Sequence, residues 1–322
     1  MASVETVRGP IDTADVGVTY MHEHVFVLTP DVQQNYPDEW GDEDARVDDA
    51  VVKLSALAAS GVQTIVDPTV IGLGRYIPRI QRVAERVPEL NIVVATGCYI
   101  YENVPFFFHH RGPALGPDLP DPMVDFFIGD ITNGIAGTGV RAAFLKCAID
   151  EPGLTSGVER VMRAVAKAHH QTGVPITVHT HPRSQTGLLV KRVMCDEEGV
   201  DPGRIVLGHS GDSTDAAHLT ELAEAGFLLG MDRFGLDVIL PMQERADIVV
   251  ELCRRGYASQ LVLSHDAACY IDWIDQNALA LMPTWNYHHL QQDVLPYLRE
   301  HGVSDEQLET MLVANPRRYF EA

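Results

Sequence analysis

The sequence predicts an α/β fold in which eight parallel strands alternate with helices and close into a (β/α)8 TIM barrel. Two observations support this prediction. Short, β-branched apolar runs recur at fairly regular intervals along the 322 residues, and amphipathic helical patterns separate most of them. The runs that we interpret as strands are residues 18–21, 64–67, 92–96, 142–146, 176–179, 205–207, 227–231 and 261–263.

The segments between these runs show helical spacing. Val47, Val51, Leu54 and Ala58, for example, follow one another at intervals of three or four residues, which places them on one helical face. An open doubly wound sheet is the alternative, but no glycine-rich phosphate-binding fingerprint follows the first strand. Glycines also follow the helical runs, where a helix C-cap needs a residue that tolerates positive φ, at Gly61, Gly173, Gly226 and Gly256.

Composition limits the functional classes. With 46% hydrophobic and 21% charged residues, the chain is expected to form one globular domain over residues 1–322. The net charge of −21 argues against binding to nucleic acid and to anionic membranes. No signal peptide or membrane-spanning run is visible, and the five cysteines form no CxxC pair. We therefore expect a cytoplasmic protein whose thiols are mostly reduced.

Three connections are longer than a tight strand-to-helix loop, and all three follow strands. They cover residues 26–44, 99–121 and 267–287, and they carry many aromatic side chains. In a barrel they would lie at the C-terminal ends of the strands, where barrel enzymes place their sites. Phe106 to Phe108 could therefore line a pocket, or they could anchor a loop or pack against a second subunit.

The stretch Tyr20-Met21-His22-Glu23-His24 carries the first chemical signal. Residues i and i+2 of a strand face the same side, so His22 and His24 are expected to point together into the barrel. Glu23 lies between them and should point away, toward a cationic or hydrogen-bonding partner. Two imidazoles can begin a metal site, but a catalytic metal usually needs three or more protein ligands.

Later strands supply the missing donors. Lys146 ends the fourth predicted strand, His179 the fifth and His209 the sixth, and the eighth runs into His265 and Asp266. Each residue alone has a structural explanation, but together they converge on one end of one barrel. Nitrogen and oxygen donors of this kind suit Zn, Fe, Co or Mn, and six ligands indicate two ions. A carbamate formed on the lysine by CO2 could span both ions with its two oxygens.

These motifs resemble those of the phosphotriesterase family in the amidohydrolase superfamily and, more narrowly, those of phosphotriesterase-like N-acyl-homoserine lactonases. The resemblance extends over essentially the whole chain. The stretches after the fifth and eighth predicted strands, His181-Pro182-Arg183-Ser184 and Asp266-Ala267-Ala268-Cys269, vary among such relatives, which leaves the substrate range open. The matching motifs are residues 9–11, 20–24, 145–148, 178–181, 208–212, 230–235 and 264–266.

The resemblance implies a ligand set and a reaction. A hydroxide bridging both ions would attack the lactone carbonyl, and weak phosphotriesterase activity would accompany this quorum-quenching reaction. Asp266 would shuttle the proton to the leaving alkoxide. The implied ligands are His22, His24 and Asp266 for the buried ion, His179 and His209 for the more exposed ion, and carbamylated Lys146 as the bridge between them.

The resemblance also implies a substrate pocket and a homodimer. Tyr99 would lie over the substrate oxygen, with Arg233 close to it, while Trp273 and Ile271 would line the channel for the lactone and its acyl chain. The alternatives are a phosphotriesterase or a hydrolase of other lactones or carboxylic esters. A metal-loaded barrel that serves only as a binding or scaffold protein is the non-enzymatic alternative.

Overall fold

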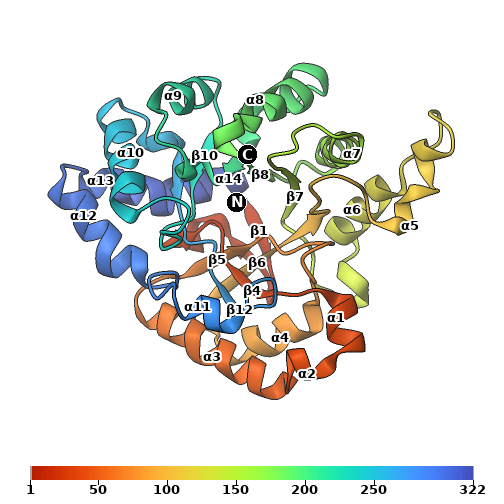
Figure 1. Ribbon diagram of the computed structural model, residues 1–322, viewed down its shortest axis with the longest axis horizontal. Helices are drawn as coiled ribbons and strands as arrows, with labels where there is room; N and C mark the ends of the chain where they lie inside the picture. The colour runs from red at the N-terminus through yellow and green to blue at the C-terminus, as the bar shows by residue number, and fades with distance from the viewer. Residues whose placement is uncertain (1, 322) are drawn as a thin grey trace.

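The computed structural model describes residues 2–321, and within them the strands form a parallel barrel surrounded by helices (Figure 1). The fold prediction is thereby confirmed. The strands are β1 (Ser3–Thr6), β2 (Gly9–Asp12), β3 (Thr19–Tyr20), β4 (His24–Val27), β5 (Thr64–Asp67), β6 (Asn91–Gly97), β7 (Phe144–Ile149), β8 (Ile176–Thr180), β9 (Ile205–Gly208), β10 (Leu228–Met231), β11 (Leu261–Leu263) and β12 (Ala268–Ile271).

Eight strands pair in parallel in the order β11-β10-β9-β8-β7-β6-β5-β3, and β1 and β2 form a separate antiparallel pair. Backbone hydrogen bonds then join the first and last segments of the barrel. The amide of Asp266 donates to the carbonyl of His22 (3.0 Å), and the amide of His24 donates to the carbonyl of Ala267 (2.8 Å). Beyond these contacts β12 pairs in parallel with β4. This closure excludes the open doubly wound sheet.

Helices cover the outside of the strands (Figure 1). The helical runs that precede Gly61, Gly173, Gly226 and Gly256 in the sequence are α3, α7, α9 and α10, but the sequence analysis did not identify α4 or α6. The α-helices are α1 (Pro30–Asn35), α2 (Pro37–Trp40), α3 (Glu43–Ala59), α4 (Ile77–Arg86), α5 (Phe106–His109), α6 (Pro122–Thr132), α7 (Ser156–Thr172), α8 (Thr186–Val190), α9 (Ala216–Glu224), α10 (Met242–Arg254), α11 (Gln276–Leu279), α12 (Leu295–Glu300), α13 (Asp305–Glu309) and α14 (Asn315–Glu321).

Successive side chains of a strand point to opposite faces, so the strands contribute to two apolar clusters. On β7, Phe144 belongs to the cluster inside the barrel, while Leu145 belongs to the cluster between strands and helices. Lys146 therefore follows Phe144 at the next inward position. The same period places His179 two residues after Thr177, whose hydroxyl meets Tyr319 inside the barrel. Strand geometry thus aims both polar side chains at the barrel interior.

Two details of the predicted strands were wrong. The first predicted strand is not continuous, because regular structure stops after Tyr20 and resumes at His24. His22 and His24 therefore converge without the regular strand that the prediction assumed. Lys146 was placed at a strand end, but β7 continues to Ile149, so this lysine lies within the strand.

The three long connections contain short elements. Trp273, Met282 and Trp285 of the last connection line the cavity described below, as the pocket interpretation predicted. Phe106 to Phe108 do not line it. They form α5, where Phe108 is buried while Phe106 remains 78% exposed, so Phe108 anchors the loop. In residues 2–321 no helix combines the length and the apolar character needed to cross a bilayer.

Glu23 is fully buried at the junction of the first and last barrel segments. Its Oε1 accepts hydrogen bonds from the Ser264 hydroxyl (2.9 Å), the His265 amide (3.0 Å) and His265 Nδ1 (2.6 Å), and its Oε2 accepts from the Ala267 amide (3.0 Å). The expected hydrogen-bonding partner of Glu23 is thus confirmed. This one carboxylate orders the chain on both sides of Asp266.

We predict that Glu23→Gln destabilises the protein by about 2–3 kcal/mol, because an amide brings a donor to a position surrounded by buried donors. The measurement is the thermal midpoint at a fixed scan rate. Glu85→Gln is the control, since Glu85 is exposed and should tolerate the change. Equal midpoints for both variants would contradict the role of Glu23 in closing the barrel.

Candidate active site

A cavity of about 340 Å³ lies at the C-terminal ends of the barrel strands. It contains all of the residues that the sequence analysis assigned to a site. Their roles stay predictions, but the structure shows that segments far apart in the sequence bring them to one place. They are His22, His24, Tyr99, Lys146, His179, His209, Arg233, Asp266, Ile271 and Trp273.

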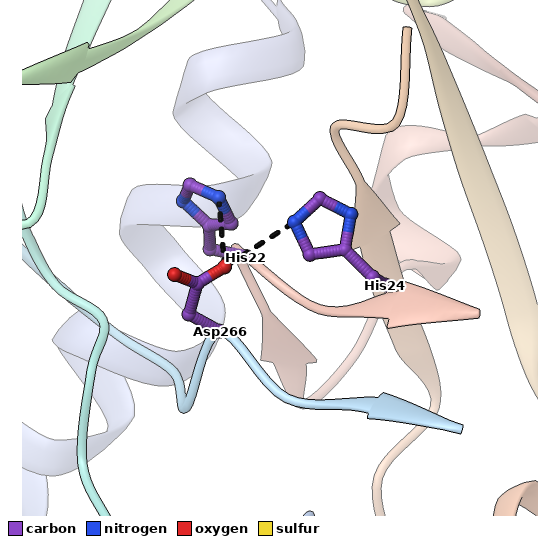
Figure 2. A group of neighbouring side chains, drawn as sticks. All are labelled: His22, His24 and Asp266. Carbon is purple, nitrogen blue, oxygen red and sulfur yellow. Dashed lines mark ion pairs between the residues drawn. The ribbon is translucent and has the colours of Figure 1, made fainter. Parts of the chain in front are cut away.

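His22, His24 and Asp266 face one another closely (Figure 2). Asp266 Oδ1 lies 3.4 Å from His22 Nε2 and 3.2 Å from His24 Nε2. Two ligands bound tetrahedrally at about 2.1 Å from one ion would be separated by about 3.4 Å. The spacing of these three side chains therefore fits a shared divalent cation.

Asp232 orients two of the histidines. Its Oδ2 lies 3.0 Å from His22 Nδ1, and its Oδ1 lies 3.0 Å from His209 Nδ1 and also accepts the backbone amide of His209 (2.7 Å). These three side chains could themselves hold a metal by geometry. Because the carboxylate already receives this backbone donor and both Nδ1 atoms, we interpret it as the group that leaves each Nε2 free to bind.

Other carboxylates orient the remaining imidazoles. His24 Nδ1 meets the Thr69 hydroxyl (2.7 Å), which in turn lies against Asp67. Asp150 contacts His179 Nε2, so Nδ1 is the ring atom of His179 that remains on the side of Tyr99. Each of the four histidines thus has one ring nitrogen engaged by a polar partner outside the proposed ligand set.

The electrostatics favour neutral histidines at three positions. Burial lowers the pKa of His22 and His209, and it lowers the pKa of His179 to about 4. At His24, burial is outweighed by hydrogen bonds to Asp266 and Asp67, which raise its pKa to about 9. Neutral imidazole is the form that binds metals, and a cation beside Asp266 would replace the proton at His24.

Lys146 is the most unusual group in the cavity. Its side chain is buried, and within residues 2–321 its Nζ has no hydrogen-bond partner. Burial lowers the pKa of this amine to about 8, which makes the neutral form accessible near neutral pH. A buried amine without a partner is costly, so the position fits a lysine that receives further ligands or a modification.

Backbone strain marks two of the predicted ligands. His209 (φ +66°) and Asp266 (φ +56°) adopt the left-handed conformation, which is uncommon for residues other than glycine. His209 directly follows β9, and Asp266 lies three residues after the end of β11. The turn that each residue makes directs its side chain across the barrel mouth, and such strained positions concentrate at functional sites.

Tyr99 and Arg233 lie above this group. The Tyr99 hydroxyl is 3.2 Å from His179 Nδ1 and 2.5 Å from the Tyr101 hydroxyl, and burial raises its pKa well above the ordinary value. It is therefore a neutral hydroxyl that can donate a hydrogen bond. Arg233 Nε donates to Asp266 Oδ2 at 2.9 Å. The tyrosine ring also lies 5.8 Å from that of Trp273, which lines the cavity.

The sequence analysis missed the carboxylates that orient the histidines. Asp67 ends β5, Asp150 directly follows β7, and Asp232 directly follows β10. All three therefore carry the signal that identified His179 and His209, which is a polar residue where a strand ends. Applying that criterion to acidic residues as well would have found them.

A (β/α)8 barrel that gathers four histidines, one buried lysine and one aspartate in one cavity is typical of hydrolases that use two metal ions. Comparison with known proteins makes the assignment specific. The model of the phosphotriesterase family matches residues 2–320, and the chain belongs to this family. The predicted resemblance to the phosphotriesterase family is confirmed, and the protein is a hydrolase of a family of binuclear metal enzymes.

Individual relatives agree with this assignment. The chain is 59% identical to the phosphotriesterase homology protein of Mycobacterium tuberculosis, over 100% of this chain and 98% of the relative. It is 39% identical to the aryldialkylphosphatase of Saccharolobus solfataricus, with 97% and 98% covered. The solved structure of the phosphotriesterase from Mycobacterium tuberculosis superposes with a TM-score of 0.97, at 59% identity and covering 99% of this chain and 98% of that one.

We predict that Asp232→Ala weakens metal binding about 10- to 100-fold, because His22 and His209 lose the carboxylate that orients them. Metal content after dialysis against a competing chelator is the measurement. Asp293→Ala is a matched control, since Asp293 pairs with His289 Nδ1 (2.8 Å) outside the cavity. Unchanged affinity in Asp232→Ala would show that this carboxylate does not support the ligands.

Proposed function

We propose that the protein is a metal-dependent lactonase that hydrolyses N-acyl-homoserine lactones and acts weakly on phosphotriesters. The observation that supports this best is the combination of a complete ligand set with an apolar channel in one cavity. Beyond the polar floor, the lining is formed by Val27, Leu73, Leu236, Val238, Ile239, Ile271, Trp273, Ile274, Met282 and Trp285.

The side chains present fit two divalent ions, with zinc preferred and iron, cobalt or manganese as alternatives. His22, His24 and Asp266 would hold one ion, His179 and His209 the other, and Lys146 as a carbamate would bridge them. The Nζ of Lys146 has no hydrogen-bond partner within residues 2–321, and burial lowers its pKa to about 8; both support the carbamate, because only a neutral amine reacts with CO2. Bound ions would lower the pKa of a water and polarise the substrate carbonyl.

The chain's own groups then handle the proton and the substrate. Water adds to the lactone carbonyl carbon, the ring C–O bond breaks, and a ring-opened acyl-homoserine is formed. Asp266 takes the proton of the attacking water and passes it to the leaving alkoxide oxygen. The neutral Tyr99 hydroxyl donates to the developing oxyanion, and Arg233 orients Asp266 through the contact at 2.9 Å.

The apolar lining favours a substrate with one long apolar substituent. Trp273 and Ile271 from the last long connection line the cavity together with Leu236 and Ile239, and none of these side chains carries a charge that could bind a polar chain. Phosphotriester hydrolysis is the second candidate, favoured by the aryldialkylphosphatase at 39% identity. The homodimer and the cytoplasmic location stay predictions.

A substrate panel combined with metal analysis of the same sample tests the proposal. We expect about two metal ions per chain and a kcat/KM for long-chain acyl-homoserine lactones that exceeds the values for simple γ-lactones and paraoxon. The reason is that the apolar walls contribute binding energy only to the long-chain substrate. Asp266→Asn should lose activity on every substrate, which shows that the activities share this site.

The possible outcomes separate the alternatives. A higher kcat/KM on paraoxon would overturn the lactonase in favour of a phosphotriesterase. Higher values on γ-lactones would indicate another ester hydrolase. Less than one metal ion per chain after reconstitution, or no turnover of any substrate, would contradict the proposal and revive the binding or scaffold protein.

A further inference from the structure

A chain of alternating charges runs from the floor of the cavity into the protein. Asp266 Oδ2 accepts from Arg233 Nε (2.9 Å), and Arg233 Nη1 donates to Asp212 Oδ2 (2.9 Å). The other oxygen of Asp212 accepts from Arg245 Nη2 (2.8 Å). Four charged groups thus alternate in sign, and each charge is compensated by its neighbour.

Arg245, at the inner end of this chain, is fully buried on α10. Its remaining groups bind two backbone carbonyls: Nη1 donates to Leu240 (3.0 Å), and Nε donates to Gly211 (3.2 Å). A guanidinium has a planar, rigid arrangement of donors, so all three partners are held in one fixed relation. Because this arginine is fully buried, its charge does not serve solubility, and its role has to lie in the contacts that it makes.

The contact with Leu240 connects Arg245 to a loop that lines the cavity. Leu240 ends the segment 235–240, which we call the cavity loop, and its residues Leu236, Val238 and Ile239 form one apolar wall. From the solvent side the loop is held by Arg183, whose Nη2 donates to the carbonyl of Ile239 (2.6 Å). Arg245 therefore anchors the cavity loop from within.

We propose that Arg245 is a positioning residue that couples the proton-carrying carboxylate Asp266 to the cavity loop. Through Asp212 it orients Arg233 against Asp266, and through Leu240 it sets the position of the apolar wall. The chain serves orientation and not proton transfer, because a guanidinium stays protonated and cannot pass a proton onward. One buried side chain thus fixes the position of the reacting groups relative to the apolar wall of the cavity.

One alternative has to be separated from this proposal. Arg245 could serve stability alone, in which case its replacement would change unfolding but not the behaviour of the cavity. The kinetic part also rests on the proposed function, so a readout is needed that requires no turnover. Hydrogen exchange of the loop provides it, since the amides of Leu236 and Ile239 bond within the segment 233–239.

The test compares Arg245→Lys with Arg204→Lys in the full chain. Lysine keeps the charge, but all its donors are on one nitrogen. It therefore cannot replace the three separate nitrogens with which Arg245 binds Asp212 and two carbonyls. Arg204 is the matched control, because it is also buried and donates to two backbone carbonyls, those of Gly173 and Tyr319, but stands just before β9 at the opposite end of the barrel. Thermal midpoints of both variants show whether the fold is retained.

We expect Arg245→Lys to raise the exchange rate of the cavity loop amides about tenfold and to lower kcat/KM about 10- to 100-fold, while Arg204→Lys changes neither. Asp212→Asn should lower kcat but leave the loop exchange nearly unchanged, because Arg245 still binds Leu240. Wild-type exchange and kinetics in a folded Arg245→Lys would overturn the proposal. If no substrate is turned over by the wild type, the exchange comparison alone decides, and increased loop exchange confined to Arg245→Lys supports the anchoring role.

Discussion

The buried carboxylate of Glu23 is the contact on which the arrangement of the site depends. It joins the first barrel segment to the last by accepting donors from Ser264, His265 and Ala267. In a barrel built from sequential strands, this closure is the contact between the first and the last barrel segments, more than 240 residues apart in the sequence. It brings Asp266 within 3.4 Å of His22, and without it the histidines of the first segment would lack their carboxylate partner.

Around this junction, buried polar groups replace the apolar side chains that would otherwise fill the interior of the barrel. Below the site, the inner cluster is filled by side chains such as Phe144 and Val206. In the site itself, the histidines are paired with Asp67, Asp150 and Asp232. Within residues 2–321 the buried Lys146 amine has no hydrogen-bond partner, which leaves one polar group of the site unsatisfied. Function and stability are therefore linked at the same residues.

Much of this could be predicted from the sequence, because strand periodicity and strand-end polarity are local signals. They identified the barrel and the six candidate ligands, whereas the family resemblance alone supplied the pocket residues Tyr99, Arg233, Trp273 and Ile271. The break at Met21–Glu23 was missed because it is imposed by closure with the last segment, a contact between residues more than 240 positions apart. Helices α4 and α6 were missed at the same stage. The chain of charges through Asp212 and Arg245 could not be predicted either, because no local sequence pattern indicates that an arginine of a helix is buried under a loop.

We propose that closure of the barrel assembles two metal positions, which Lys146 as a carbamate would bridge. Anomalous diffraction from crystals of the zinc-loaded protein tests this proposal most directly. We expect two peaks, one beside His22, His24 and Asp266 and one beside His179 and His209, with density extending from Lys146 Nζ between them. A single peak, a peak held by Asp232, or an unmodified lysine lying away from both ions would contradict it.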